Sequence, residues 1–186
     1  MDYYFESSYL TQEITSGKNR DFVLDVFDHL NDLEENDINT WKHSETSDYY
    51  FQQRPIGGNR PFSILDLNIT NTDLKEFLLN QGLIPSEKKE FVEDQQMDDY
   101  RQNIGNADCF SNTSYAVFFS SVNDSVDYIW FDYKDDFSTE SDRLAVSAIL
   151  NELGQKYAFI LIDWYERNII DLSDQKRINQ YLDSLL

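Results

Sequence analysis

The segment that most constrains the fold is Tyr157–Leu172, with the sequence YAFILIDWYERNIIDL. Its first part, Tyr157–Ile162, is an unbroken apolar run rich in β-branched and aromatic side chains, which is typical of a strand covered on both faces. Glu166-Arg167-Asn168 then indicates a tight reversal, because asparagine tolerates the positive φ of such turns. A second apolar run, Ile169–Leu172, follows. We therefore predict a β-hairpin in the middle of the core.

The segments before this hairpin also alternate between strand and helix patterns. Tyr115–Val122 and Val126–Tyr133 predict another hairpin, since both runs favour strands and a short polar turn separates them. A helix is expected to start at Ser138 or Thr139. Its inward residues would be Leu144, Ala148, Ile149 and Leu153.

A final helix is expected after Ser173, which is a suitable N-cap. The second half of the chain thus has the order hairpin, helix, hairpin, helix. This order is typical of a largely antiparallel sheet with helices packed mainly on one face. We predict an α+β fold that forms a single domain over residues 1–186.

The first half gives weaker patterns. We expect helices at Asp21–Glu35, after Asn71 or Thr72, and at Glu87–Asn103, the last on the surface. We expect strands at residues 2–10, Ile38–Trp41, Thr46–Gln53 and Phe62–Ile69. A polar loop, Gly105–Ser114, would hold Cys109.

Net charge limits the partners that the chain can bind. The formal net charge is −20, from 35 Asp and Glu against 15 Lys and Arg. Such a chain has little to replace the counterions of a nucleic-acid backbone, so we expect neither direct nucleic-acid binding nor contact with an anionic membrane. A basic protein partner, or solubility alone, fits this charge.

Three further features indicate the cellular compartment. No apolar run approaches the roughly 20 residues that a membrane span needs. The N-terminal residues MDYYFESSYL lack the basic and apolar regions of a secretory signal. Cys109 is the single cysteine, which suits a reducing compartment. We therefore expect a cytoplasmic protein.

The negative charge is clustered along the chain. Residues 21–50 hold nine acids and one base, and residues 93–136 hold ten acids and two bases. Self-repulsion favours spreading like charges apart, so this clustering favours an acidic interaction surface. Within Asp21–Glu35, apolar side chains recur on one side at helical spacing, and five acids recur on the opposite side. Like charges at i, i+4 cost about 0.2–0.5 kcal/mol per pair, and no Lys or Arg relieves them here.

Aromatic residues are interleaved with the acids of these clusters. Protein interfaces use Tyr and Trp as anchors, and surrounding carboxylates steer a cationic partner toward them. The candidate partner-binding residues are Asp25, Asp28, Asp32, Asp48, Tyr49, Trp130, Asp132, Asp135, Asp136, Trp164 and Glu166. Alternation within a strand could equally place the rings in the core and the acids in water.

The sequence contains no pattern typical of catalysis. Its two histidines, His29 and His43, have no HExxH or paired Cys/His spacing for zinc. Asp132-Tyr133-Lys134 matches the short acid-x-Lys signature of some metal-dependent nucleases, but such a match is common by chance. Gly57-Gly58 lacks the spacing of a phosphate-binding loop. We expect no catalytic residue, no metal and no cofactor.

The acidic segments Asp21–Glu35 and Val126–Asp136, in a small α+β chain, resemble the immunity proteins of bacterial toxin–immunity systems in charge and size. The resemblance implies an inhibitor that covers the active site of a basic toxin domain, often a nuclease, in the bacterial cell that makes it. Its carboxylates would occupy the phosphate-binding groove of the toxin. Three other interpretations stay open: a DNA mimic that blocks a nucleic-acid-binding protein, a small enzyme with an unrecognised site, and a module whose acidity only keeps it soluble.

Overall fold

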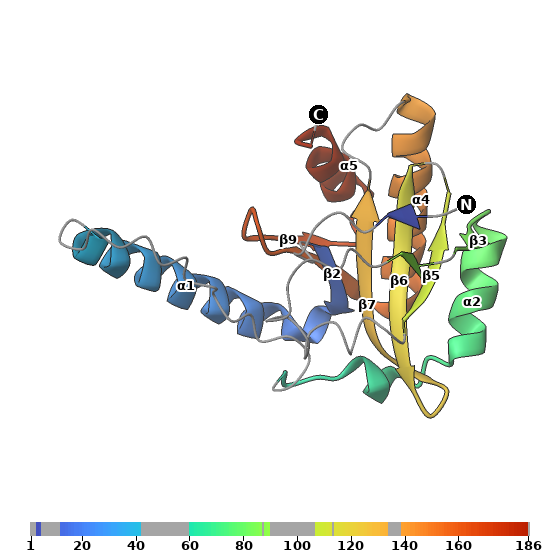
Figure 1. Ribbon diagram of the computed structural model, residues 1–186, viewed down its shortest axis with the longest axis horizontal. Helices are drawn as coiled ribbons and strands as arrows, with labels where there is room; N and C mark the ends of the chain where they lie inside the picture. Colours follow the sequence, from blue (N-terminus) through green and yellow to red (C-terminus); the bar gives the residue numbers. More distant parts are fainter. Residues whose placement is uncertain are drawn as a thin grey trace.

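In the computed structural model, the described residues are 3–4, 12–41, 60–86, 88–89, 107–112, 114–133 and 139–185. Most of their strands form one seven-stranded sheet (Figure 1). The strand order is β3 (Ile84–Pro85), β5 (Asp108–Ser111), β6 (Tyr115–Val122), β7 (Ser125–Tyr133), β2 (Gln12–Ser16), β8 (Phe159–Asp163) and β9 (Asn168–Asp171). Neighbouring strands are antiparallel throughout this sheet. A separate parallel pair joins β1 (Tyr3–Tyr4) to β4 (Lys88–Lys89).

The helices begin where side chains can accept the first free backbone N–H groups. Thr70 caps α2 (Asn71–Asn80), Thr139 caps α4 (Glu140–Tyr157) and Asp174 caps α5 (Gln175–Asp183). The first long helix, α1 (Arg20–Trp41), follows the 3₁₀ turn η1 (Gly17–Asn19), and a second 3₁₀ turn, η2 (Ile64–Leu67), precedes α2. Thr139 is one of the two caps that the sequence predicted for α4, whereas the predicted caps Asn71 or Thr72 and Ser173 are wrong, because Thr70 and Asp174 cap α2 and α5.

The main hydrophobic core lies between the sheet and the helices α2, α4 and α5. Residues at alternate positions of the strands point to this face and are buried. They include Ile14, Val117, Phe119, Ile129, Phe131 and Leu161, which pack with Leu74, Leu78, Leu150, Leu153, Ile178 and Leu182 of the helices. Gly154 permits α4 to approach the end of β9, because a Cβ there would lie 2.0 Å from the carbonyl carbon of Leu172.

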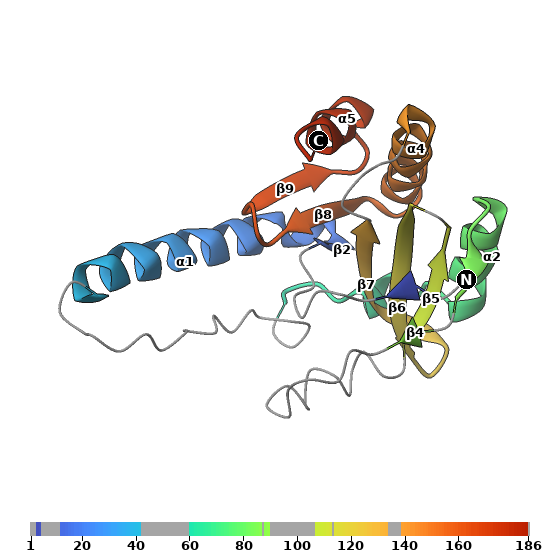
Figure 2. The same cartoon turned by 45° about the horizontal axis from the view of Figure 1, so that its top comes forward.

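The opposite face of the sheet is covered by α1 at the end formed by β8 and β9. Val23 and Phe27 of α1 pack with Ile160, Ile162, Trp164 and Ile169. Figure 2 shows α5 above β8 and β9 and α1 below them. In both views the C-terminal half of α1 continues beyond the sheet. The prediction of an α+β fold, with an antiparallel sheet and helices mainly on one face, is confirmed.

Several predicted elements are wrong. The predicted central hairpin is real, as β8 and β9, but it lies at one end of the sheet, and its positive φ falls on Arg167 instead of Asn168. Ile38–Trp41 belongs to α1, and Phe62–Ile69 contains a 3₁₀ turn in place of a strand. The predicted loop around Cys109 contains strand β5.

Two inward positions predicted for the helix before the hairpin are also wrong. Leu144 is 52% exposed and Ala148 is exposed, because the packed side of α4 is formed by Val146, Ile149, Leu150 and Leu153. Of the predicted helix Glu87–Asn103, the described residues Lys88 and Lys89 form a strand. The predicted strand Thr46–Gln53 lies outside the described residues.

None of the helices that the structure describes combines the length and the apolar composition needed to cross a lipid bilayer.

Candidate protein interface

The turn between β8 and β9 is held from inside by one buried carboxylate. Asp163 is 1% exposed. Its Oδ1 accepts the backbone N–H groups of Tyr165 and Glu166, both at 3.0 Å. Its Oδ2 accepts the hydroxyl of Tyr181 at 2.7 Å and the amide of Gln12 at 3.5 Å. The start of the turn is therefore fixed to α5 and to β2.

The same turn is also fixed against α1. The ring of Trp164 meets that of Phe27 edge to face, with centroids 5.5 Å apart. The Trp164 indole N–H donates to Glu13 Oε2 at 3.0 Å. At the end of the turn, the Arg167 guanidinium donates to Asn31 Oδ1 of α1, and Arg167 has φ 50°. A residue other than glycine adopts this conformation at a cost, so surrounding contacts must hold it.

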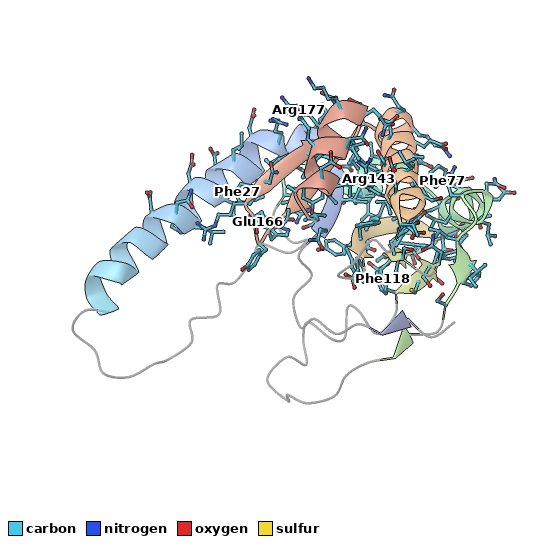
Figure 3. All side chains as sticks on the ribbon, turned by 90° about the horizontal axis from the view of Figure 1, so that it is seen from above. Phe27, Phe77, Phe118, Arg143, Glu166 and Arg177 are labelled. Carbon is cyan, nitrogen blue, oxygen red and sulfur yellow. The ribbon has the colours of Figure 1, made fainter. Side chains whose placement is uncertain are left out.

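This rigid turn presents an exposed aromatic side chain. Tyr165 is 76% exposed, more than any other large hydrophobic side chain that the structure describes. Glu166 beside it is also exposed. Phe27 and Glu166, both labelled in Figure 3, mark the place where the turn meets α1. An exposed ring on a fixed turn is a feature of binding sites, because little side-chain and backbone freedom is lost when it is buried.

The exposed side of α1, the helix on which this turn docks, is acidic. Asp25, Asp28 and Asp32 are all exposed, and so is Asp21 in the first turn of the helix. Leu24, 43% exposed, lies on the flank between these acids and β9. We name the exposed residues Leu24, Asp25, Asp28, Asp32, Tyr165 and Glu166 the α1–turn surface.

A buried ion pair lies beneath this surface. Glu13 of β2 is fully buried, and Arg60 binds both of its carboxylate oxygens, with Nη2 2.6 Å from Oε2. Burial lowers the pKa of Arg60, but the hydrogen bond and charge of Glu13, with a contribution from Tyr128, outweigh it and raise that pKa. The pair is therefore charged and internal, and it adds no free charge to the surface.

The far end of β9 has its own electrostatic contact with α1. Asp171 accepts the hydroxyl and the backbone N–H of Ser173, and these bonds hold its pKa below the usual value near 3.8. The positive charges of Arg20 and Arg177 lower this pKa further. Arg20 opens α1, so the charge of this helix end acts on one end of β9, while the turn before β9 contacts Asn31 of α1 through Arg167.

Four of the residues predicted from the sequence are exposed on the two elements of this surface: Asp25, Asp28 and Asp32 on α1, and Glu166 on the turn. Asp132 does not join them, because it lies on β7, two strands away from β8, and is partly buried. The predicted residues Asp48, Tyr49, Asp135 and Asp136 lie outside the described residues.

Two predicted anchors are not available at the surface. Trp130 is 1% exposed and stacks on Phe118, with centroids 5.4 Å apart. Trp164 is 6% exposed and is held by Phe27 and Glu13. The prediction that Trp130 and Trp164 are exposed partner-binding residues is therefore wrong, since both rings lie in the interior on the α1 side of the sheet.

The exposed ring that sequence reasoning missed is Tyr165. Strand parity offered a signal for it. Ile160 and Ile162 point to α1, so Trp164, two residues further along, continues toward the same side, and Tyr165 does not. Glu13 and Arg60 were also missed, because nothing in the sequence indicates that such distant residues pair.

In the described ranges, no group of three or more His, Cys, Asp or Glu side chains gathers where it could hold a metal ion. The α1–turn surface instead offers an aromatic ring, an aliphatic side chain and carboxylates, which suits contact with another macromolecule. Comparison of the chain with protein-family models, with curated proteins and with solved structures finds no match.

Proposed function

We propose that the protein binds a basic protein partner through the α1–turn surface and inhibits it, in the manner of an immunity protein that neutralises a toxin domain. One observation carries the proposal. Tyr165 is 76% exposed on a turn that contacts from Asp163, Trp164 and Arg167 hold in place, and this turn docks on α1, whose exposed side carries a row of carboxylates.

The physical reason is the combination of rigidity, exposure and charge. Tyrosine buries a large area on binding and loses few rotamers, so it is common among residues that dominate interface energies. Carboxylates around such an anchor raise the association rate of a cationic partner. On a basic nuclease, Asp25, Asp28 and Asp32 would occupy the groove that otherwise binds phosphates, and Tyr165 would fill a neighbouring pocket.

The spacing of the acids bears on the DNA-mimic alternative. Along the axis of α1, neighbouring acids at i, i+3 and i, i+4 are about 4.5 Å and 6 Å apart. Each strand of a DNA duplex carries one charge about every 3.4 Å of its axis. The row on α1 is therefore less dense in charge than the backbone it would imitate, which favours an ordinary acidic interface.

The experiment begins with recovery of the partner by affinity purification, followed by binding kinetics with the purified pair. The triple change Asp25→Asn, Asp28→Asn, Asp32→Asn is expected to lower the association rate about 10-fold at low salt and to flatten its salt dependence. The matched control is Asp73→Asn, Glu76→Gln, Glu152→Gln, which neutralises three exposed acids on α2 and α4, on the other side of the sheet. This control should leave the salt dependence nearly unchanged.

Tyr165→Ala tests the aromatic anchor separately. We expect the complex to dissociate faster and the affinity to fall about 30-fold, which corresponds to about 2 kcal/mol. Tyr165→Phe should keep most of the affinity, since the ring provides the buried area. Equal salt dependence for the two triple variants, with unchanged affinity for Tyr165→Ala, would remove this surface from the proposal.

A further inference from the structure

We infer that the outer edge of β9 accepts an extended, basic segment of the partner as an additional strand of the sheet. This inference rests on the proposed function and specifies how the partner is held. In strand addition, backbone hydrogen bonds supply affinity and alternate side chains supply specificity.

The two edges of the sheet differ. At one end, β3 has two residues, and one of them is Pro85, which has no backbone N–H to donate. At the other end, β9 has four residues and contains no proline. Figure 2 shows β9 as the last strand of the sheet at this end. Of the two edges, β9 is therefore the one that can pair with another strand.

The register identifies the backbone groups on the outer edge. Leu172 N–H donates to Phe159 C=O at 3.2 Å, and Ile160 faces Asp171 in the ladder. Hydrogen-bonded and non-hydrogen-bonded pairs alternate in an antiparallel ladder, so Asn168 and Ile170 also point their backbone groups toward β8. Ile169 and Asp171 point theirs outward.

One of these outward groups already has a partner. Asp171 C=O accepts the backbone N–H of Asp174 at 3.1 Å, at the start of α5. The N–H and C=O of Ile169 and the N–H of Asp171 are left on the outer edge of the ladder. These three groups match the alternating donors and acceptors of an incoming antiparallel strand.

The first turns of α1 lie beside this edge. Arg20, Leu24 and Asn31 are at i, i+4 and i+11 and share one flank of the helix. Asn31 contacts the turn at one end of β9, and the charge of Arg20 acts on Asp171 at the other end, so Leu24, on the same flank of α1, lies between these two positions. A strand added to β9 would pass Leu24, which is 43% exposed, and would have Asp21 and Asp28 next to it. It would therefore alternate apolar and cationic side chains.

A second copy of this chain fits the edge poorly. Each copy carries a formal net charge of −20, and pairing two β9 edges would bring the acidic flanks of both α1 helices together. Like charges in such a position repel, whereas lysine or arginine side chains would be attracted. The occupant is thus an extended basic segment of a different protein.

The test uses a capped peptide of alternating lysine and valine as the probe and the full chain as the receptor. Amide hydrogen exchange is measured by NMR for Ile169 and Asp171, with Ile84 of β3 as the internal control. At saturation the peptide should slow exchange at Ile169 and Asp171 about 10-fold or more, and leave Ile84 unchanged. A Pro variant of β9 is not useful here, since Ile169 packs in the core with Val23 and Phe27.

Two comparison peptides separate the possible failures. The same peptide with every backbone nitrogen methylated keeps its charges but has no donors, and it should give no protection. A glutamate–valine peptide should bind much more weakly. Absence of protection by the lysine–valine peptide, or equal protection by the methylated peptide, would overturn the strand addition and leave the acidic interface standing. Equal protection by the glutamate–valine peptide would overturn the basic occupant. Failure of the proposed function would show instead in the Asp-to-Asn and Tyr165→Ala kinetics.

Discussion

The two faces of the sheet each bury a carboxylate, and they satisfy it in different ways. On the α1 side, Glu13 is held by the cation of Arg60 and by the indole of Trp164. On the α4 and α5 side, Asp163 is held by neutral donors: the hydroxyl of Tyr181, the amide of Gln12 and two backbone N–H groups. The first site depends on an opposite charge, and the second does not.

This difference indicates which part of the fold depends on a single residue. Arg60 is 47 positions from Glu13 in sequence, and losing it would leave a buried charge without its counterion. Asp163 divides its interactions among several donors, so the loss of one leaves the others in place. The α1 face should therefore be the more sensitive of the two to single substitutions.

The largest effect is expected for Arg60→Met. Removing one partner of a buried ion pair costs about 3–5 kcal/mol of unfolding free energy, because the remaining charge stays buried. Replacing both partners, as in Glu13→Leu with Arg60→Met, should recover part of this loss, since no buried charge then remains, although the indole N–H of Trp164 loses its acceptor. Urea denaturation of the two variants and the wild type measures the difference. A double variant as unstable as Arg60→Met would show that the charge was not the cause.

The second effect concerns Tyr115, a buried ionisable side chain of β6. Burial raises the pKa of Tyr115 to about 12, although a hydrogen bond with Asn112 lowers it, and the negative charge of Asp142 adds a smaller increase. The folded state therefore holds this proton more tightly than the unfolded chain. The resulting contribution of Tyr115 to the unfolding free energy is fully present below pH 10 and is lost as the pH rises toward 12.

Tyr115→Phe isolates that contribution. Between pH 10 and 12 the wild type should lose about 1.4 kcal/mol per pH unit more than the variant does. Urea denaturation at pH 8, 10 and 11 measures the two slopes, with Tyr165→Phe as a control because its ring is exposed. Parallel slopes for the wild type and Tyr115→Phe would contradict the raised pKa.

The sequence predicted those parts of this molecule whose structure depends on local signals. The hairpin β6–β7, the cap at Thr139 and the presence of the final helix α5 follow from periodicity, turn residues and capping residues. Strand β2 was missed because its sequence, QEITS, is polar, although all five residues are buried in the sheet. Its burial depends on partners from elsewhere in the chain, such as Arg60 for Glu13 and Asp163 for Gln12, which no local pattern contains.

The candidate surface was likewise predicted only where local signals were sufficient. Helical spacing was sufficient to place Asp25, Asp28 and Asp32 on the exposed side of α1. The sequence could not show that the β8–β9 turn docks on this helix, because that contact joins Arg167 to Asn31 across 136 positions. Strand parity separates Trp164 from Tyr165, but only this contact shows that the side of Trp164 is covered by α1.

A smaller effect should distinguish the Asp163 site from the Glu13 site. Tyr181→Phe removes one neutral donor to Asp163 and leaves the other three, so we expect a loss of about 1 kcal/mol in unfolding free energy. Tyr165→Phe is the matched control and should change stability by less than about 0.5 kcal/mol. Urea denaturation at neutral pH measures both. A loss from Tyr181→Phe as large as that from Arg60→Met would abolish the contrast between the two faces.

The smallest effect is expected on the exposed side of α1, above the Glu13 face. Asp25, Asp28 and Asp32 repel one another at i, i+3 and i, i+4, so changing all three to asparagine should raise the unfolding free energy by about 0.5 kcal/mol at low salt. Asp21 is left unchanged, since a negative charge in the first helical turn is favourable. The gain should disappear in high salt, which screens exposed charges but leaves the buried Arg60–Glu13 pair almost unaffected. The same three carboxylates would thus destabilise the free protein slightly while they speed its association with a partner. We would measure the salt dependence of unfolding free energy for this triple variant and for Arg60→Met. A salt-dependent gain in the first, and a salt-independent loss in the second, would distinguish charges retained for binding from a charge retained for folding.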